Sequence, residues 1–543
     1  MAIESTVPPK KTTVLVIGGG PAGSCAATIL RREGHDVTLL ELSKFPRYHV
    51  GESMLPSLRN YLNFIGLEEE FEKHGFLGKP GACFKLVRDL RESWTDFTNL
   101  GPGYATWNVI RSEMDELMLR HAQKQGVHVF EETKAEEIQF ENDGDPQTAR
   151  PISATWSKKD GSTGKIEFDW LIDASGRAGI MSTKYLKNRM MRESLRNVAV
   201  WGYWKDVKRY GVGTKKENSA WFEALNDESG WSWIIPLHNG TTSVGFVMHQ
   251  TKSNEKKASL KPDGTKRSLT EHYLDQLQHV PGVRELIGDK GSFIPGSTKS
   301  TSDFSYSATR YSGNHFRIIG DAANFVDPFF SSGVHIGMTG ALSAAATICA
   351  SIRGQIDEPA SQAWHDAKVG IAHTRFLLVV LGAYKQMHLQ SNMVLSDINA
   401  NNFDTAFEMF RPVIFGLADS QKKLTDARVS EVMEICQSFF DPKVNEDDIS
   451  QTRQRYGVDL VKMQAPVLGK EKIDELVGSD EVGARVLKKF DALKVFSDDV
   501  EAAYMGRNPL LGYRAHVKRG ELGLIKEEEP LAQGESEIIV AAP

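Results

Sequence analysis

The chain of 543 residues carries 65 basic and 71 acidic side chains, which give a formal net charge of −6, and 40% of its residues are hydrophobic. This slightly acidic composition lacks the excess of basic residues that marks nucleic-acid-binding proteins, so no nucleic-acid partner is expected. The four cysteines have neither close pairing nor C-x-x-C spacing, so we expect neither a disulfide framework nor a metal site.

The amino terminus and the apolar runs predict where the protein works. Residues 1–11 are short and polar and lack the apolar segment of a signal peptide. The most apolar run, residues 376–382, is too short to span a bilayer. We therefore expect a cytoplasmic protein with no membrane span.

The first elements in chain order predict a βαβ unit. A β-branched run at residues 14–17 leads into a G-x-G-x-x-G loop, an Ala-rich helix over 24–33 and a second apolar run at 37–40. In such a loop Gly18 permits the tight turn, Gly20 lets the backbone approach a pyrophosphate, and Gly23 allows close packing of helix on strand. Glu41 follows the second strand, where an acid accepts the ribose hydroxyls. The unit predicts a dinucleotide site.

Later segments return to the same kind of structure. A helix is expected over 111–125, a strand over 168–172, antiparallel strands over 198–246, a buried strand over 316–319 and a small-residue helix over 333–351. The strand that ends at Gly320-Asp321 resembles the second fingerprint of flavoproteins, in which the Asp holds the ribitol. This favours FAD over NAD.

The fold class expected is α/β with α+β character: a Rossmann-like FAD domain of the flavoprotein monooxygenase type, an interleaved antiparallel substrate region and a helical carboxy-terminal part. FAD-binding segments are expected at 1–80, 111–195 and 306–357, and substrate-region strands at 81–110 and 196–305. A helical region is expected over 358–525 and a disordered tail over 526–543.

Three features allow both a functional and an ordinary interpretation. Lys79 lies among glycine, proline and aromatic residues, a setting that desolvates an ammonium, but most lysines are solvated. Trp231 and Trp233 alternate and so face one side of a strand, as in any sheet core. Ser332 and Gly333 precede a helix, where they serve either as an anion site or as a simple cap.

Several segments together resemble the flavin-dependent halogenases, specifically the fungal enzymes that act on free phenolic compounds. The resemblance runs from about residue 12 to about residue 526. The segments that carry it are 18–23, 46–56, the loop around Lys79, the W-x-W-x-I-P run at 231–236 and the loop at 327–333. The lysine with the tryptophan run is specific to this family, whereas the glycine motifs are shared with flavoprotein monooxygenases.

The resemblance implies a role for individual residues. Lys79 matches the catalytic lysine, Ser332 and Gly333 match the halide site, and Trp231 with Trp233 matches the barrier that keeps substrate from the flavin. Besides Gly18, Gly20 and Gly23, the positions implied in FAD binding are Gly19, Ala22, Arg47, Glu52, Asp321 and Val334. Pro236 and Pro328 belong to the motif segments. Tryptophan halogenases carry a second catalytic acid where this chain has Phe330, which argues for a phenolic substrate.

The implied activity is oxidation of chloride or bromide with O2 and reduced FAD. Hypohalous acid then passes to Lys79, which either hydrogen-bonds it or forms a haloamine and delivers the halogen to a phenol ring. A separate flavin reductase is the expected partner, and the enzyme is expected to be a monomer or homodimer. The alternatives are an FAD-dependent aromatic hydroxylase of the same fold and a flavin-binding protein without catalysis.

Overall fold

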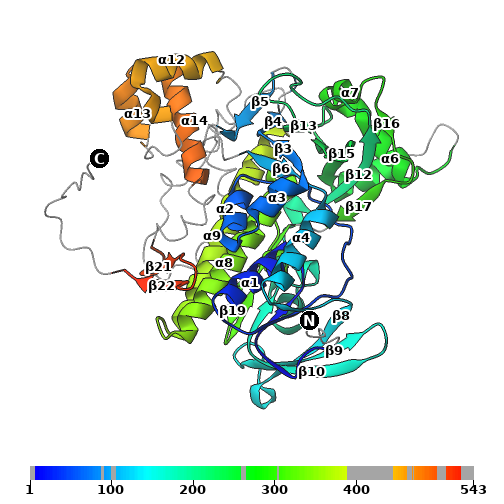
Figure 1. Ribbon diagram of the computed structural model, residues 1–543. Coiled ribbons are helices and arrows are strands. Elements are labelled where there is room, and N and C mark those ends of the chain that lie inside the picture. The colour runs from blue at the N-terminus through cyan, green and yellow to red at the C-terminus, as the bar shows by residue number, and fades with distance from the viewer. Residues whose placement is uncertain are drawn as a thin grey trace.

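Segments from distant parts of the chain meet in one mostly parallel sheet of eight strands (Figure 1). The computed structural model describes residues 7–86, 88, 91–98, 105–258, 264–302, 305–387, 444, 446–461, 468, 470–497 and 509–527. The strand order is β19-β20-β10-β1-β2-β7, and β9 joins β10 and β8 in an antiparallel extension. The strands are β1 (Lys11–Ile17), β2 (Val37–Leu40), β7 (His128–Phe130), β8 (Thr133–Phe140), β9 (Pro151–Lys158), β10 (Thr163–Asp173), β19 (Ser312–Gly313) and β20 (Phe316–Ile318).

Both faces of the central parallel strands are buried, which explains their continuous apolar runs. Val14 and Val16 face α1 (Pro21–Arg32), α4 (Arg111–Lys124) and α8 (Gly333–Ile352). Leu15 and Ile17 point the other way, into a cluster that includes residues of β8, β9 and β10. The strand and helix positions predicted for this part of the chain are confirmed within one to three residues at most ends.

The register of the sheet brings three chain segments to one edge. Ile17 is the partner of Leu40 and of Asp173, and Asp173 in turn is the partner of Ile318. The carboxyl ends of four parallel strands are therefore level, and in doubly wound sheets ligands bind at this edge.

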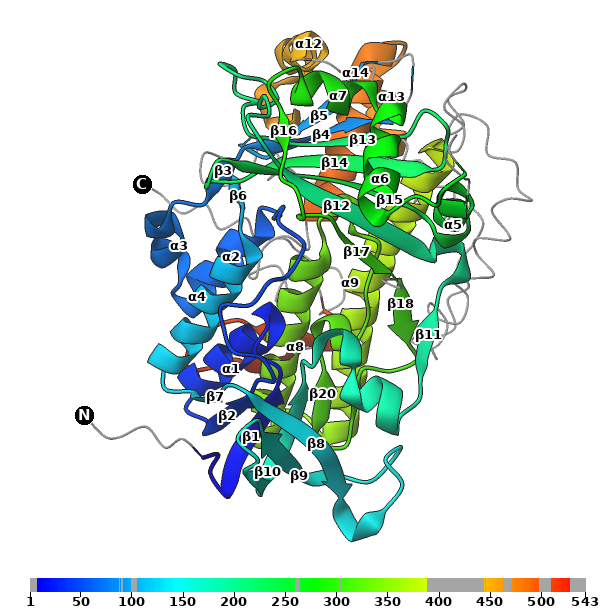
Figure 2. The ribbon, with the colours of Figure 1, turned by 90° about the vertical axis from the view of Figure 1, so that its right-hand side faces the viewer.

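A second sheet of eight strands lies above the first (Figure 2). Its order is β16-β12-β15-β14-β13-β4-β5, with β17 also paired to β12. All its pairs are antiparallel apart from β4 with β13. The strands are β4 (Gly81–Lys85), β5 (Ser93–Asp96), β12 (Asn197–Lys205), β13 (Ala220–Ala224), β14 (Gly230–Pro236), β15 (Thr241–His249), β16 (Ser292–Phe293) and β17 (Lys299–Ser302).

The two faces of the second sheet bury different partners. One face packs on α6 (Leu269–Asp275) and α7 (Pro281–Ile287). The other carries Trp231 and Trp233 and packs on α8 and α9 (Glu358–Met387). Further elements are α2 (Ser57–Ile65), α3 (Glu68–His74), β3 (Leu77–Lys79), β6 (Thr106–Asn108) and α5 (Gln250–Ala258), together with β11 (Arg189–Met191) and β18 (Tyr306–Ala308).

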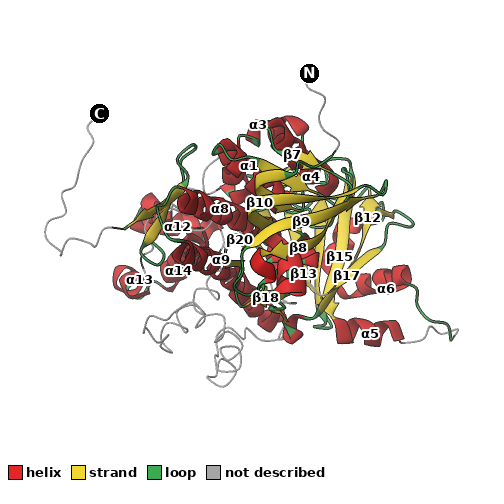
Figure 3. Cartoon of the chain, turned by 90° about the horizontal axis from the view of Figure 1, so that it is seen from below, coloured by secondary structure: helices red, strands yellow, loops and turns green. Residues whose placement is uncertain are grey.

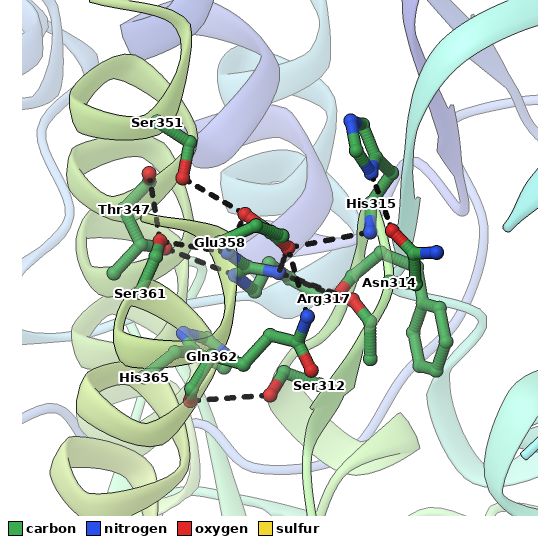
Figure 4. Close-up of polar contacts among 12 residues, drawn as sticks. Ser312, Asn314, His315, Arg317, Thr347, Ser351, Glu358, Ser361, Gln362 and His365 are labelled. Carbon is green, nitrogen blue, oxygen red and sulfur yellow. Dashed lines mark hydrogen bonds and ion pairs between the residues drawn. The ribbon is translucent and has the colours of Figure 1, made fainter. Parts of the chain in front are cut away.

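A buried polar network joins β20 to the helix pair α8 and α9 (Figure 4). Arg317 is fully buried, and its guanidinium donates to Glu358 Oε1 at 2.9 Å, Ser361 Oγ at 2.9 Å and Thr347 Oγ1 at 3.1 Å. Because an unpaired buried charge is strongly destabilising, these bonds hold the strand and both helices in one arrangement.

Two described helices are long and apolar enough to cross a membrane by length and composition alone, although neither contains one long uninterrupted apolar run. They are Gly333–Ile352 and Glu358–Tyr384. The first is the predicted small-residue helix, in which Gly, Ala, Ser and Thr interrupt the apolar residues. In the apolar window of α8, 89% of the residues are buried inside the protein, as in the core helix of a globular fold.

The carboxy-terminal part is not helical throughout, which corrects the prediction for 358–525. Helices α12 (Glu446–Tyr456), α13 (Lys470–Val477) and α14 (Glu481–Ser497) lie on the opposite side of α8 and α9 from β12 (Figures 1 and 3). These helices are followed by a hairpin of β21 (Tyr513–His516) and β22 (Gly523–Lys526). The hairpin is held by Ala515, Leu522 and Leu524, which are buried in the core shared with α8. Residues 388–443 lie outside the described residues, as does nearly all of the predicted tail.

Candidate active site

A cavity of about 910 Å³ begins at the carboxyl edge of the parallel sheet and reaches the tryptophan face of the second sheet. A volume in this range is typical of small-molecule and cofactor sites. Its lining contains the predicted residues Gly18, Gly20, Ala22, Gly23, Glu41, Arg47, Glu52, Trp231, Trp233, Asp321, Pro328, Gly333 and Val334. Among the described residues, the predicted positions Gly19, Lys79, Pro236 and Ser332 lie outside this lining.

The glycine loop forms a cradle that only glycine permits. Gly18 has φ +106°, and a side chain there would begin 2.2 Å from the carbonyl oxygen of Ala174. A side chain on Gly23 would begin 1.9 Å from the carbonyl oxygen of Gly18. A side chain on Gly20 would begin 3.5 Å from its nearest neighbour, the Arg47 guanidinium, so the approach to the first turn of α1 is open. The backbone N–H groups at the start of α1 and the helix dipole suit a pyrophosphate.

Two acids stand at either end of this cradle. Glu41 accepts from the backbone N–H of Gly19 at 2.6 Å and of Ser43 at 2.7 Å, which aims the carboxylate along the cavity wall. Burial raises the pKa of Asp321 to about 6, although nearby arginines, Arg111 first among them, oppose the rise. The loop, the two acids and the cavity volume together fit FAD.

Arg47 and Glu52 are each held by a polar partner. Arg47 forms an ion pair with Asp115 at 2.8 Å, and Asp115 also binds Arg111 through both carboxylate oxygens. Glu52 is buried, which raises its pKa, and it accepts from the Tyr203 hydroxyl at 2.6 Å. The pairing fixes two side chains that line the cavity between the cradle and the second sheet.

Lys79 is a buried lysine with neutral partners. Its side chain is 1% exposed, and Nζ donates to Ser53 Oγ and to the carbonyl oxygen of Met54, both at 2.8 Å. Nζ also lies 4.9 Å from the centre of the Phe97 ring. Burial lowers the pKa of Lys79 from 10.5 to about 7. At neutral pH the amine and the ammonium are therefore both populated.

Ser53 links this lysine to the loop that precedes α8. The Ser331 hydroxyl donates to Ser53 Oγ at 3.0 Å, so Ser53 accepts from both sides. Ser331 adopts φ +56°, a left-handed conformation that is uncommon outside glycine. Both Ser53 and Ser331 line the cavity, which gives the buried lysine a polar connection to it.

The predicted halide position shows an unused donor. Ser332 is fully buried, and its Oγ has no hydrogen-bond partner among the described residues. It stands at the N-cap of α8, a helix of 20 residues, but its side chain does not cap the helix. An orphaned hydroxyl beside free helix amides is a fitting place for a small anion.

Asp327 anchors the same loop to the second sheet and to α9. Its carboxylate accepts from Asn197 Nδ2 at 2.8 Å and from the Tyr384 hydroxyl at 2.9 Å. Tyr384 in turn accepts from Trp231 Nε1 at 2.9 Å. Burial raises the pKa of Asp327 to about 6. The position of the loop is therefore tied to that of the tryptophan strand.

The tryptophans form a wall of the cavity. The rings of Trp231 and Trp233 lie 5.8 Å apart on one face of β14, as their alternation predicted. Phe329 meets Trp231 edge-on at 5.0 Å, which closes the wall against the loop. Pro236 ends β14 and pairs with Thr242 of β15. The wall separates the cavity from the core behind it.

Sequence reasoning assigned no role to Ser53, Asp327 or Tyr384. The first two belong to motif segments of the sequence. Their roles could not be predicted, because hydrogen bonds between residues far apart in sequence leave no periodic signal. Tyr384 lies in an apolar helix with no motif at all. Only the packed structure shows what these side chains contact.

Comparison with known proteins decides the family. The FAD binding domain family matches residues 11–372. The protein named flavin-dependent halogenase armH5, from Armillaria mellea, is 55% identical over 524 residues, covering 95% of this chain and 99% of its own. The chain belongs to the flavin-dependent halogenases.

Other relatives agree with this membership. The sulochrin halogenase gedL of Aspergillus terreus is 46% identical and covers 97% of this chain and 95% of its own. The crystal structure of the flavin-dependent halogenase CmlS has a TM-score of 0.66 and 28% identity, covering 83% of this chain and 78% of that one. The halogenase is thus an FAD-dependent oxidoreductase that acts on a small molecule. The predicted fold class and the preference for halogenation over hydroxylation are confirmed.

Proposed function

We propose that this halogenase installs chlorine or bromine on a free phenolic aromatic. The balanced reaction is ArH + X⁻ + O2 + FADH2 + H⁺ → ArX + FAD + 2 H2O. Reduced FAD, when bound, would supply two of the four electrons that O2 takes up, and the halide would supply the other two. A separate flavin reductase delivers the reduced flavin, and the protein works in the cytoplasm.

The observation that carries the proposal is the buried amine of Lys79. A neutral amine has two N–H groups, which match its acceptors Ser53 Oγ and the Met54 carbonyl. Its lone pair is then free to attack hypohalous acid, giving R–NHX and water. Transfer of the halogen to the ring and of the ring proton to nitrogen restores the amine. The pKa of about 7 keeps this neutral form available under working conditions.

Ser332 and Gly333 are the proposed halide site. The orphaned Ser332 hydroxyl and the first amides of α8 supply donors without a positive side chain. The chain Ser331–Ser53–Lys79 begins beside this site and ends at the amine. Because both serines also line the cavity, this chain supports a short path for hypohalous acid from the halide site to the amine.

A phenol is the proposed substrate because its hydroxyl group already activates the ring toward an electrophile. Phe330, at the position where the resemblance places an acid in tryptophan halogenases, packs edge-on against Phe329 at 4.8 Å and offers no carboxylate. A phenol hydroxyl directs an electrophile to the ortho and para carbons without protein help.

The test is one assay. The holoenzyme, a flavin reductase with NADH and a panel of resorcylic and orsellinic phenols are incubated with chloride, with bromide and with neither, and the products are analysed by mass spectrometry. We expect halide-dependent isotope doublets, and their loss in Lys79→Ala with FAD still bound. Full activity of Lys79→Ala would refute the role of the lysine. A gain of one oxygen without halide would make the protein a hydroxylase.

A further inference from the structure

Three potential metal ligands converge outside the cavity, from three separate elements. His74 is the last residue of α3, Glu113 lies in the first turn of α4, and His238 lies in the turn between β14 and β15. Their ligand atoms all lie within 4.8 Å of one another. Nothing in the proposed halogenation uses these side chains.

The distances are close to those of a metal site. Glu113 Oε2 lies 2.7 Å from His74 Nε2 and 3.2 Å from His238 Nε2. With zinc–ligand bonds of about 2.0–2.1 Å, the ligand atoms of a tetrahedral site lie about 3.3 Å apart. Small side-chain rotations therefore open the cluster enough to admit the ion at its centre.

The surroundings hold both imidazole rings in place. Phe76 packs against the His74 ring at 4.3 Å and against the His238 ring at 5.5 Å, so each ring has an apolar wall. All three side chains are partly exposed to solvent: 28% for His74, 36% for Glu113 and 21% for His238. This exposure leaves a path for the ion and for a water as fourth ligand. Two neutral imidazoles and one carboxylate carry a net charge of −1, which attracts a cation.

We propose that His74, Glu113 and His238 form a binding site for a zinc-class divalent transition metal. Imidazole nitrogen with carboxylate oxygen is a donor set that zinc accepts, in a three-ligand site with an open position. The proposal departs from our expectation of no metal site, which rested on cysteine spacing alone. Its ligands are far apart in sequence and only the packing of α3, α4 and the β14–β15 turn unites them.

The site would join the two segments on which the active site depends. His74 ends the helix that leads into β3, the strand of Lys79. His238 stands two residues beyond the end of β14, the strand of both tryptophans. A bound ion would clamp these segments together from the outside. It would raise the thermal stability of the enzyme without contacting FAD or substrate.

The experiment is a zinc titration of the chelator-stripped, full-length holoenzyme in competition with a chromophoric chelator. We expect one tightly bound Zn²⁺ per chain and a rise in the unfolding temperature on loading. His238→Ala and Glu113→Gln should each weaken zinc binding at least about 100-fold, since even the partners of metal ligands contribute 10–100-fold. Both variants should keep their FAD.

The matched control is His128→Ala. His128 is an exposed histidine whose Nε2 lies 3.4 Å from Asp36, so it offers zinc one imidazole and one carboxylate but no cluster. Zinc binding should be unchanged in this variant. Equal affinity in His238→Ala, or binding that His128→Ala weakens as much, would overturn the proposal, as would the absence of zinc binding in the native enzyme. If His238→Ala loses FAD, His238→Gln and Glu113→Gln, which keep side-chain volume, decide the question.

Discussion

Replacing Lys79 by methionine should abolish halogenation and yet stabilise the protein at neutral pH. Methionine has a similar volume and no charge, so it removes the amine while it fills the buried space. Lowering the pKa of Lys79 from 10.5 to about 7 corresponds to about 5 kcal/mol of destabilisation at low pH. The loss of the bond to the Met54 carbonyl offsets about 1–3 kcal/mol of this. The net gain expected is about 2–4 kcal/mol.

The sign of this effect depends on pH. The unfolded lysine keeps its proton up to its ordinary pKa of 10.5, whereas the folded lysine releases it at about 7. The native enzyme therefore bears the full penalty below pH 7, a falling one between pH 7 and 10.5, and none above. The advantage of Lys79→Met should shrink over the same interval and reverse above it, where only the lost hydrogen bond remains.

The assay compares unfolding of the native enzyme and Lys79→Met, by denaturant and by heat, at several pH values across that interval. Lys73→Met is the control, because the Lys73 side chain is 74% exposed and forms a surface ion pair with Glu69. It should change stability by no more than about 0.5 kcal/mol at any pH. A Lys79→Met variant that is less stable than the native enzyme at pH 7, with no dependence on pH, would refute the reasoning.

Three further changes test the remaining parts of the site. Ser53→Ala removes an acceptor of the lysine and should lower kcat about tenfold, the equivalent of one hydrogen bond of about 1.4 kcal/mol, with halide KM unchanged; an unchanged kcat would dismiss Ser53. Ser332→Asp places a carboxylate at the proposed halide site and should raise the halide KM at least about tenfold while flavin oxidation by O2 continues; equal loss of both activities would argue against a halide site. Gly23→Ala puts a methyl group 1.9 Å from the Gly18 carbonyl, so the purified protein should carry little FAD, as flavin absorbance measures; full occupancy would contradict the close packing.

Local chemistry alone determined the dinucleotide loop. The turn at Gly18 needs a positive φ and the contact at Gly23 tolerates no side chain. The two glycines in the sequence therefore predict this backbone geometry. The alternation of Trp231 and Trp233 likewise determined that both rings share one face of a strand. For Lys79 the sequence supplied a resemblance, but its own neighbours did not distinguish a catalytic lysine from a solvated one.

Tertiary structure decided what those residues can do. The register of β1, β10 and β20 brings Gly18 and Asp321 to one sheet edge although they lie far apart in the chain. The pKa of Lys79 depends on how completely β3, Ser53 and Met54 enclose it, and the cluster of His74, Glu113 and His238 exists only where three elements meet. Periodicity records which face of an element is apolar, whereas desolvation and side-chain contacts depend on which elements pack together, and that is a property of the folded chain.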